Sequence, residues 1–179
     1  MIYEFCAENV TLLEKAMQAG ARRIELCDNL AVGGTTPSYG VTKAAVELAA
    51  NYDTTIMTMI RPRGGDFVYN DLEIAIMLED IRLTAQAGSQ GVVFGVLTAD
   101  KKLDKPNLEK LIAASKGMEI VFHMAFDELS EEDQLEAIDW LSQAGVTRIL
   151  TRAGVSGDSL DKRFAHYHRI LEHAKGKIE

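Results

Sequence analysis

The stretch Ala19-Gly20-Ala21-Arg22-Arg23-Ile24-Glu25-Leu26 recurs in the same form at residues 87–94 and 144–151. In each copy a helical pattern ends in Ala-Gly, two or three residues follow, and an apolar strand then begins. Glycine suits the end of a helix because it enters the left-handed conformation without a Cβ penalty. A short connection from a helix to a strand is typical of parallel α/β folds. The three copies therefore predict consecutive helix–strand junctions.

These junctions divide the chain into six strand–helix units. We expect strands at Tyr3–Cys6, Arg23–Cys27, Thr55–Ile60, Gly91–Gly95, Glu119–His123 and Arg148–Thr151, and helices that begin near Asn9, Gly40, Asn70, Lys105, Ser130 and Ser159. Strict alternation allows either a doubly wound sheet or a barrel. No Gly-x-Gly-x-x-Gly turn directly follows the first strand, which disfavours a dinucleotide-binding sheet. We therefore predict an α/β fold of the TIM (β/α) barrel type.

The predicted barrel is incomplete. A full barrel has eight units and typically about 250 residues, whereas this chain has 179 residues and about six units. We expect residues 1–179 to form a single (β/α) barrel domain that lacks the last strands, with Lys177-Ile178-Glu179 where a seventh strand would begin. An open barrel exposes two strand edges and an apolar interior. Either the chain is truncated, which we favour, or a partner or a rearrangement closes the gap.

Composition narrows the class of protein. With 19 basic and 27 acidic residues the net charge is −8, which argues against a broad surface for nucleic acid or for an anionic membrane. No signal peptide is visible, and no apolar run is long enough to span a bilayer. The chain has only two cysteines, Cys6 and Cys27. We expect them to be free thiols in a reducing compartment, the cytoplasm.

Thiols and carboxylates alternate on the first two predicted strands, as Glu4-x-Cys6 and Glu25-x-Cys27. Residues two apart share a face of a strand, and neighbouring strands lie about 4.8 Å apart, so these groups are expected to come together. Thiolates select Cu(I) over hard cations, and Met57 and Met59 on the third strand could add thioethers. The alternative is that these sulfur-containing residues only fill the core.

The run Arg61-Pro62-Arg63-Gly64-Gly65-Asp66-Phe67 follows the third strand. Its guanidinium groups and the backbone N–H groups of Gly64 and Gly65 predict a site for a small anion, with Asp66 beside it. The alternative is an ordinary glycine turn in which the arginines pair with Asp66 or Glu4.

The run His123-Met124-Ala125-Phe126-Asp127 closes the fifth strand. Because histidine titrates near neutral pH, His123 is the best candidate for a general acid or base, with Glu25 and Asp127 as further catalytic candidates. A hydrogen-bonded structural histidine is the competing interpretation.

At these residues the sequence resembles the CutC family of copper homeostasis proteins. The resemblance is carried by Ile24–Cys27, Gly33–Ser38, Ile60–Phe67, Phe122-His123 with Ala125–Asp127, and Arg148–Thr151, of which Ile60–Phe67 is the most specific. It implies a TIM barrel, a cytoplasmic location, self-association into a homo-oligomer and a role in copper homeostasis, with Cys6 and Cys27 as the copper-binding thiols. Two departures are Met124, where the family pattern has arginine, and Thr151-Arg152-Ala153, which replaces a stretch richer in serine and glycine.

Three functions remain open from the sequence. The first is a cytoplasmic copper homeostasis protein that binds Cu(I) and contributes to copper tolerance or trafficking, and we favour it because of the resemblance. The second is a barrel enzyme that acts on a small anionic or phosphorylated metabolite held by Arg61 and Arg63. The third is a scaffold that acts through surface contacts. Whether the protein is an enzyme is left undecided by the sequence.

Overall fold

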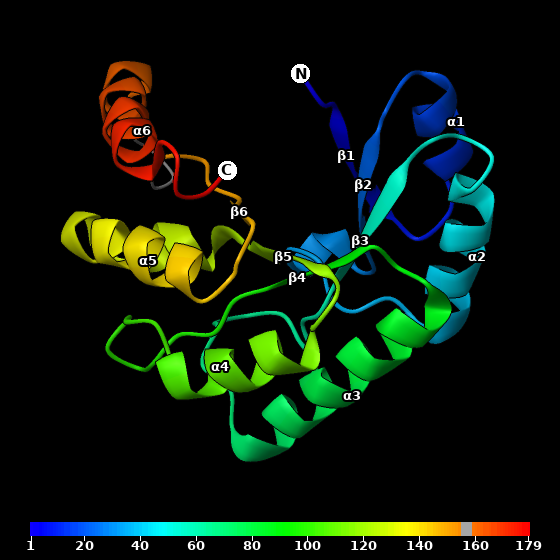
Figure 1. Ribbon diagram of the computed structural model, residues 1–179, viewed down its shortest axis with the longest axis horizontal. Helices are drawn as coiled ribbons and strands as arrows, with labels where there is room; N and C mark the ends of the chain where they lie inside the picture. Colours follow the sequence, from blue (N-terminus) through cyan, green and yellow to red (C-terminus); the bar gives the residue numbers. More distant parts are fainter. Residues whose placement is uncertain (155–158) are drawn as a thin grey trace.

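The computed structural model describes residues 1–154 and 159–179. Six parallel strands form one sheet in the order β1-β2-β3-β4-β5-β6, so every strand pairs with its neighbours in the chain. The strands are β1 (Glu4–Glu8), β2 (Arg23–Cys27), β3 (Thr55–Met59), β4 (Gly91–Phe94), β5 (Glu119–Phe122) and β6 (Arg148–Ile149). The sheet curls into an open half-barrel (Figure 1). The predicted (β/α) barrel class and its incompleteness are confirmed.

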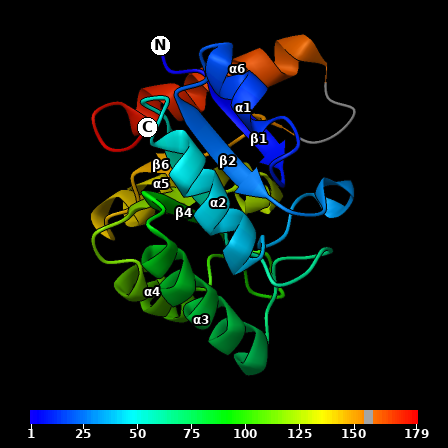
Figure 2. The ribbon, with the colours of Figure 1, turned by 90° about the vertical axis from the view of Figure 1, so that its right-hand side faces the viewer.

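The helices alternate with the strands and cover the convex side of the sheet (Figure 1). They are α1 (Leu13–Gln18), α2 (Tyr39–Ala49), α3 (Asp71–Ala87), α4 (Lys105–Ala114), α5 (Glu131–Gln143) and α6 (Leu160–Ala174), with short 3₁₀ helices η1 (Leu30–Val32) and η2 (Met124–Glu128). Figure 2 shows α2 in front of β2, with α1 above it and α3 below it. This is the arrangement expected when right-handed crossovers connect parallel strands.

Local sequence signals fix most helix ends. The side chain of Asn70 accepts a hydrogen bond from the backbone of Glu73, whose carboxylate accepts one from the backbone of Asn70, so the two residues form a capping box. The repeat glycines Gly20, Gly88 and Gly145 have φ angles of 100°, 89° and 92°, which confirms the predicted left-handed helix ends. The predicted start of the first helix at Asn9 is wrong. Asn9 lies in a turn at φ 56°, and α1 begins at Leu13.

The two faces of the sheet bury different residues. On the convex face, Ile24, Leu26 and Ile56 pack with α1 and α2, and a larger cluster packs β4 and β5 against α3, α4 and α5. Apolar burial of this kind contributes about 25 cal/mol per Å². The concave face holds a smaller cluster of sulfur-containing and β-branched residues, namely Cys27, Met57, Met59, Val93 and Val121. Chemistry-bearing side chains are therefore concentrated on the concave face.

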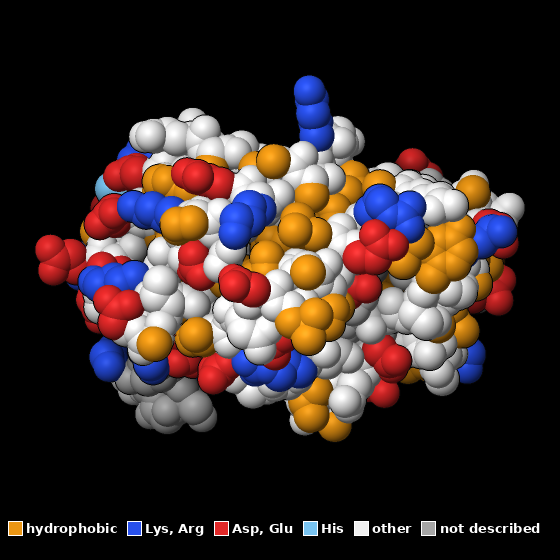
Figure 3. All heavy atoms as spheres, turned by 90° about the horizontal axis from the view of Figure 1, so that it is seen from below, with side chains coloured by type: hydrophobic (Ala, Val, Ile, Leu, Met, Phe, Trp, Pro, Cys, Tyr) orange, Lys and Arg blue, Asp and Glu red, His pale blue; other side chains and the backbone are white. Residues whose placement is uncertain are grey.

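The half-barrel is open between β1 and β6, whose outer edges have no strand beside them among residues 1–154 and 159–179. Ile149 N donates to Glu179 O at 2.8 Å, and Glu179 N donates to Thr147 O at 3.2 Å. This is the hydrogen-bond pattern of a parallel pair, so Glu179 lies beside β6 at the predicted position of a seventh strand. No helix within the described ranges is long and apolar enough to cross a bilayer. On the face shown in Figure 3, basic and acidic side chains are interspersed.

Candidate functional site

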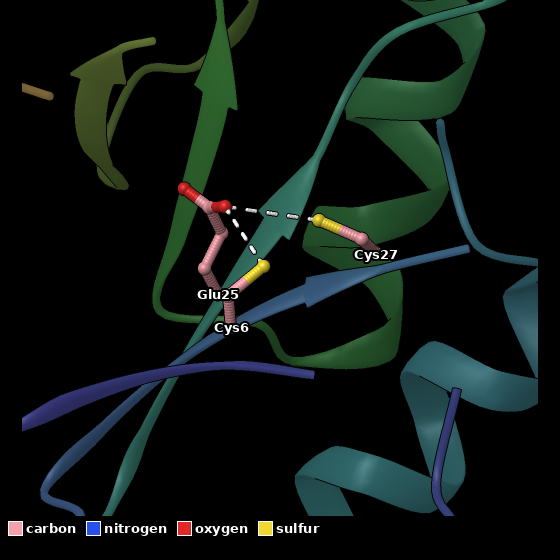
Figure 4. A group of neighbouring side chains, drawn as sticks. All are labelled: Cys6, Glu25 and Cys27. Carbon is pink, nitrogen blue, oxygen red and sulfur yellow. Dashed lines mark hydrogen bonds between the residues drawn. The ribbon is translucent and has the colours of Figure 1, made fainter. Parts of the chain in front are cut away.

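The two cysteine thiols and the Glu25 carboxylate meet on the concave face of β1 and β2. Cys6 and Glu25 are Cα partners in the parallel register, and Cys27 lies two residues beyond Glu25 on the same face. The Cys6 thiol donates to Glu25 Oε1 at 3.4 Å, and the Cys27 thiol donates to the same oxygen at 3.8 Å (Figure 4). One ligand atom from each of these residues lies within 4.8 Å of the others. The predicted convergence of the thiols is present in the structure.

The surroundings of this cluster raise the pKa values of Cys27 and Glu25. Cys27 is buried, whereas Cys6 is exposed at the open side of the half-barrel. The hydrogen bond with Cys6, burial and the neighbouring Glu25 all raise the pKa of the Cys27 thiol above its ordinary range. Burial raises the pKa of Glu25 as well, against the opposing effect of the thiol hydrogen bonds. Metal binding at the Cys27 sulfur therefore competes with a proton.

The other predicted members of the sulfur cluster lie differently. Glu4 turns to Arg23, with Oε2 at 3.2 Å from Arg23 Nη1, and does not join the thiols. Met59 packs with Cys27 in the buried concave cluster. The Met57 sulfur accepts a weak hydrogen bond from Arg148 Nη2 at 3.6 Å, which directs it towards β6. Met59 is therefore the better-placed candidate for a third soft ligand.

Arg61 connects the two loops that follow β2 and β3. Its Nη1 atom donates to Val32 O at 2.9 Å and to Gly34 O at 2.8 Å, and its Nη2 atom donates to Gly65 O at 2.8 Å. The side chain is buried. Most of its hydrogen-bonding capacity is therefore used to hold the loop 28–36 against the loop 61–67.

Arg63, the second arginine of the run 61–67, lies at the surface. It forms ion pairs with Glu73 and Asp66, the latter at 3.0 Å between Nη1 and Oδ1. The hydrogen bond from Arg63 lowers the pKa of Asp66. Gly64 lies against Val32, where an added Cβ would be 2.7 Å from the valine Cβ. In the run 61–67, Arg63 and Asp66 thus satisfy each other, as the alternative interpretation from the sequence proposed.

His123 lies at the end of β5 in a buried environment. Its Nδ1 atom accepts the backbone N–H of Ala125 at 3.2 Å and so caps η2. Burial lowers the pKa of His123 to about 3, and the positive charge of Arg61 acts in the same direction. The expectation that this ring titrates near neutral pH is therefore wrong. Glu25 is not its hydrogen-bond partner, because Nδ1 is used by Ala125 and Nε2 has no partner among the described residues.

Asp127 fixes the ends of β5 and β6 together. Its carboxylate accepts from Thr151 Oγ1 at 2.6 Å and from the backbone N–H of Arg152 at 3.2 Å, and Arg152 Nε lies 3.7 Å from it. The side chain is buried. Its observed contacts are those of a positioning group, and its predicted role in catalysis stays a prediction.

A chain of contacts places these residues on one rim. The Cys27 sulfur lies against Gly34, whose carbonyl is held by Arg61. The Arg61 guanidinium lies 5.0 Å from the centre of the Phe67 ring, and the His123 ring lies 4.8 Å from it. The C-terminal ends of β2, β3 and β5 therefore bring a thiol, a guanidinium and an imidazole together, as expected for the active face of such barrels.

Sequence reasoning missed two aromatic residues of this rim. Phe67 contacts both Arg61 and His123, and Tyr69 is buried with Arg63 5.2 Å from its ring centre. The available signal was their position: both lie within four residues of Gly65, in a stretch where an exposed loop would have few aromatic residues.

The donor set of the thiol cluster fits a soft monovalent metal ion. Metal–thiolate bonds are about 2.3 Å long, so two sulfurs on one ion lie up to about 4.6 Å apart, close to the 4.8 Å limit observed here. Cys6 and Cys27 would hold Cu(I), and the exposed Cys6 would give it access from the open side. Glu25 adds a hard oxygen, which suits the acceptance of thiol protons better than the binding of Cu(I).

Comparison with solved structures supports the barrel fold and shows one relative of high sequence identity. Over all of this chain and 85% of the other chain, the crystal structure of CutC from Streptococcus agalactiae superposes with a TM-score of 0.96 at 45% identity. An archaeal fructose 1,6-bisphosphate aldolase superposes over 91% of this chain and 62% of its own, with a TM-score of 0.64 at 17% identity. The likeness to the aldolase concerns the barrel fold alone.

Comparison of sequences identifies the family. The profile of the CutC family matches residues 1–179. The family protein CutC of Enterococcus faecalis is 51% identical over 99% of this chain and 85% of its own length. The human copper homeostasis protein cutC homolog is 40% identical over 99% of this chain and 62% of its own length. On these matches, the chain belongs to the CutC family.

Proposed function

We propose that this protein binds Cu(I) through the thiolates of Cys6 and Cys27 and so serves copper homeostasis, in copper tolerance or trafficking. The observation that carries the proposal is the convergence of both thiols and Glu25 within 4.8 Å on the concave face. Two free thiols and adjacent thioethers are the ligands that favour Cu(I). A reducing compartment such as the cytoplasm would keep both thiols available. We propose a homo-oligomer as the assembled form, as the family resemblance implies.

Binding of Cu(I) would require both sulfurs to lose their protons. Glu25 accepts the hydrogen bonds of both thiols through one oxygen, so its carboxylate is placed to take one of the two protons as the metal enters, and the other leaves to solvent from the exposed Cys6. The exposed Cys6 would meet the ion first, and the buried Cys27 would then complete the site. Such an order suits the capture and release of an ion better than permanent structural binding.

The alternative function, an enzyme that acts on a small anionic metabolite, requires a group at the rim that moves protons near neutral pH. His123 does not supply it, because burial lowers its pKa to about 3. Arg63 and Asp66 are paired with each other, which leaves Arg61 as the cation of the rim. We therefore place the copper role first.

Anaerobic Cu(I) titration against a chromogenic competitor tests the proposal. Cys6→Ser and Cys27→Ser should each weaken Cu(I) binding by at least about tenfold, because a two-thiolate site loses half of its soft ligands. Met59→Leu tests the third ligand, and Met17→Leu, a buried methionine on the convex side, is the matched control. Circular dichroism of each variant establishes that it is folded. Binding as tight as the parent's in both serine variants would exclude this copper site.

A further inference from the structure

Three buried side chains near the rim carry polar atoms with no hydrogen-bond partner among the described residues. They are Arg61 Nε, Tyr69 Oη and His123 Nε2. Arg61 and His123 are 4% exposed and Tyr69 is 7% exposed, so bulk water does not satisfy them. A buried polar group without a partner costs roughly 1–3 kcal/mol. Arg61 and His123 both contact the ring of Phe67, and Arg61 also acts on Tyr69, so one ligand between these side chains would supply the missing partner.

Two of the three atoms are donors. His123 Nδ1 accepts the N–H of Ala125, so the proton of the neutral ring is on Nε2, which becomes a donor. Arg61 has only donors, and its Nη1 and Nη2 atoms bond to carbonyls, which leaves the Nε–H group unused. The Tyr69 hydroxyl can donate as well. The missing partner must therefore be an acceptor.

The charge around these donors is positive. Arg61 forms no ion pair within the described part of the chain, and the nearby Asp66 is paired with Arg63. Burial raises the pKa of Tyr69, and both the charge of Arg61 and a contact of hydrogen-bond type with its guanidinium oppose that rise. The phenol oxygen therefore lies beside the cation, whereas its O–H proton has no acceptor among the described residues. A buried cation without a counter-ion is strongly unfavourable. An anionic acceptor would satisfy both the charge and the donors.

A surface pocket lies on the other side of Phe67 from these donors. This pocket, of about 430 Å³, is lined by Gly65, Phe67, Val68 and Lys101, among others. Phe67 contacts both Arg61 and His123, and Gly65 accepts a hydrogen bond from Arg61. Rotation of the Phe67 ring would connect the pocket with the unpaired donors. At this pocket Lys101 pairs with Glu128 at 3.0 Å and Asp66 pairs with Arg63, so the charges of its lining compensate one another and Arg61 is the cation behind Phe67.

We propose that Arg61, Tyr69 and His123 form a binding site for a small oxyanion, a phosphate or carboxylate group, that enters beside Phe67. Arg61 Nε and His123 Nε2 donate to its oxygens, and the Tyr69 hydroxyl adds a third hydrogen bond. Arg63 is not part of the site, because Glu73 and Asp66 already pair with it. The site is separate from the thiol cluster, so it does not depend on copper binding.

Isothermal titration of the full chain with inorganic phosphate and, in a separate arm, with malonate tests the proposal. His123→Asn keeps an acceptor for the Ala125 N–H, because asparagine is a good helix cap, but removes the Nε2 donor. Tyr69→Phe removes a hydroxyl that contacts Arg61 and has no acceptor for its own proton, so this variant should remain folded. Each variant should lower the affinity for the anion that binds by about tenfold, the value of one hydrogen bond to a charged group.

Controls separate the site from general salt effects. Chloride at equal ionic strength accounts for screening, and Glu109→Gln, an exposed residue on α4, should bind as the parent does. Cys27→Ser should also keep anion binding, which distinguishes this site from the copper site. The arm that saturates identifies the anion as phosphate or carboxylate. Absence of saturable binding in both arms, or unchanged affinity in both His123→Asn and Tyr69→Phe, would overturn the proposal.

Discussion

The sulfur of Cys27 lies directly against Gly34, where an added Cβ would be 3.1 Å from Sγ. Gly34 has φ 86°, a conformation that L-residues rarely adopt, and its carbonyl accepts a hydrogen bond from Arg61. One backbone position thus touches the buried thiol on one side and the rim arginine on the other. The shape of the thiol cluster depends on this glycine.

Gly34→Ala should therefore impair both folding and Cu(I) binding. The left-handed backbone costs a non-glycine residue about 1–2 kcal/mol, and the new methyl group should displace Cys27. Gly145→Ala is the matched control, since Gly145 has φ 92° and no atom within 4 Å of an added Cβ. Urea denaturation should show a loss of stability in both variants, larger in Gly34→Ala because of the contact with Cys27, whereas Cu(I) competition should show weaker binding in Gly34→Ala alone. Equal Cu(I) affinity in the two variants would contradict the close packing on Cys27.

The affinity for Cu(I) should rise with pH. The hydrogen bond with Cys6 and burial raise the pKa of Cys27, so its thiol is protonated at neutral pH and must release a proton to bind the metal. Each proton displaced makes the apparent affinity about tenfold tighter per pH unit. Cu(I) competition across the neutral range, with calorimetry in buffers of different ionisation enthalpy, measures the slope and the protons released. A flat pH profile would mean that Cys27 is not a thiolate ligand.

Much of the fold could be predicted because its signals are local. The Ala-Gly helix ends need only a glycine in the right place, and Asn70 with Glu73 forms its capping box within one turn. The start of α1 was missed because Asn9, a good helix cap by type, instead adopts a left-handed turn after β1. Whether an asparagine caps a helix or forms a left-handed turn depends on its tertiary contacts, and the sequence alone does not give these contacts.

Part of the candidate site could likewise be predicted from local signals, and part of it could not. Convergence of Cys6 with Glu25 follows from the strand period and the pairing of consecutive strands, so it could be predicted. The surroundings of His123 could not, because its pKa depends on burial and on Arg61, which comes from another loop. The different roles of Arg61 and Arg63 also depend on tertiary contacts, because Arg63 forms an ion pair with Glu73 on α3.

Glu25→Gln should stabilise the protein at neutral pH. Burial raises the pKa of Glu25 in the folded state above its ordinary value of 4.5, so the folded protein binds this proton more tightly than the unfolded chain does. Its contribution to stability is fully present below about pH 4.5 and is lost as pH rises through the folded-state pKa. Glutamine avoids the charge, and each unit between the two pKa values is worth about 1.4 kcal/mol.

Urea denaturation from acid to neutral pH tests this sign. The advantage of Glu25→Gln over the parent should grow as pH rises, and it should shrink towards acid pH. Glu109→Gln, on the exposed face of α4, should show no such trend. A variant that loses stability at neutral pH would indicate that the Glu25 carboxylate is satisfied in its charged form.

Arg61→Lys and Arg63→Lys should differ sharply although both keep the charge. Arg61 holds three carbonyls from two loops, and a single ammonium group cannot reproduce that planar set of donors, so its replacement should cost about 2–4 kcal/mol. The Arg63 side chain is 39% exposed, and its ion pairs with Asp66 and Glu73 are screened by solvent, so its replacement should cost much less than that of Arg61. Denaturant midpoints measure both losses. If the two variants lost equal stability, Arg61 would not be the residue that connects the loops after β2 and β3. The thiol cluster and the unpaired donors of the rim would then lack a fixed loop arrangement around them, and both proposed sites depend on that arrangement.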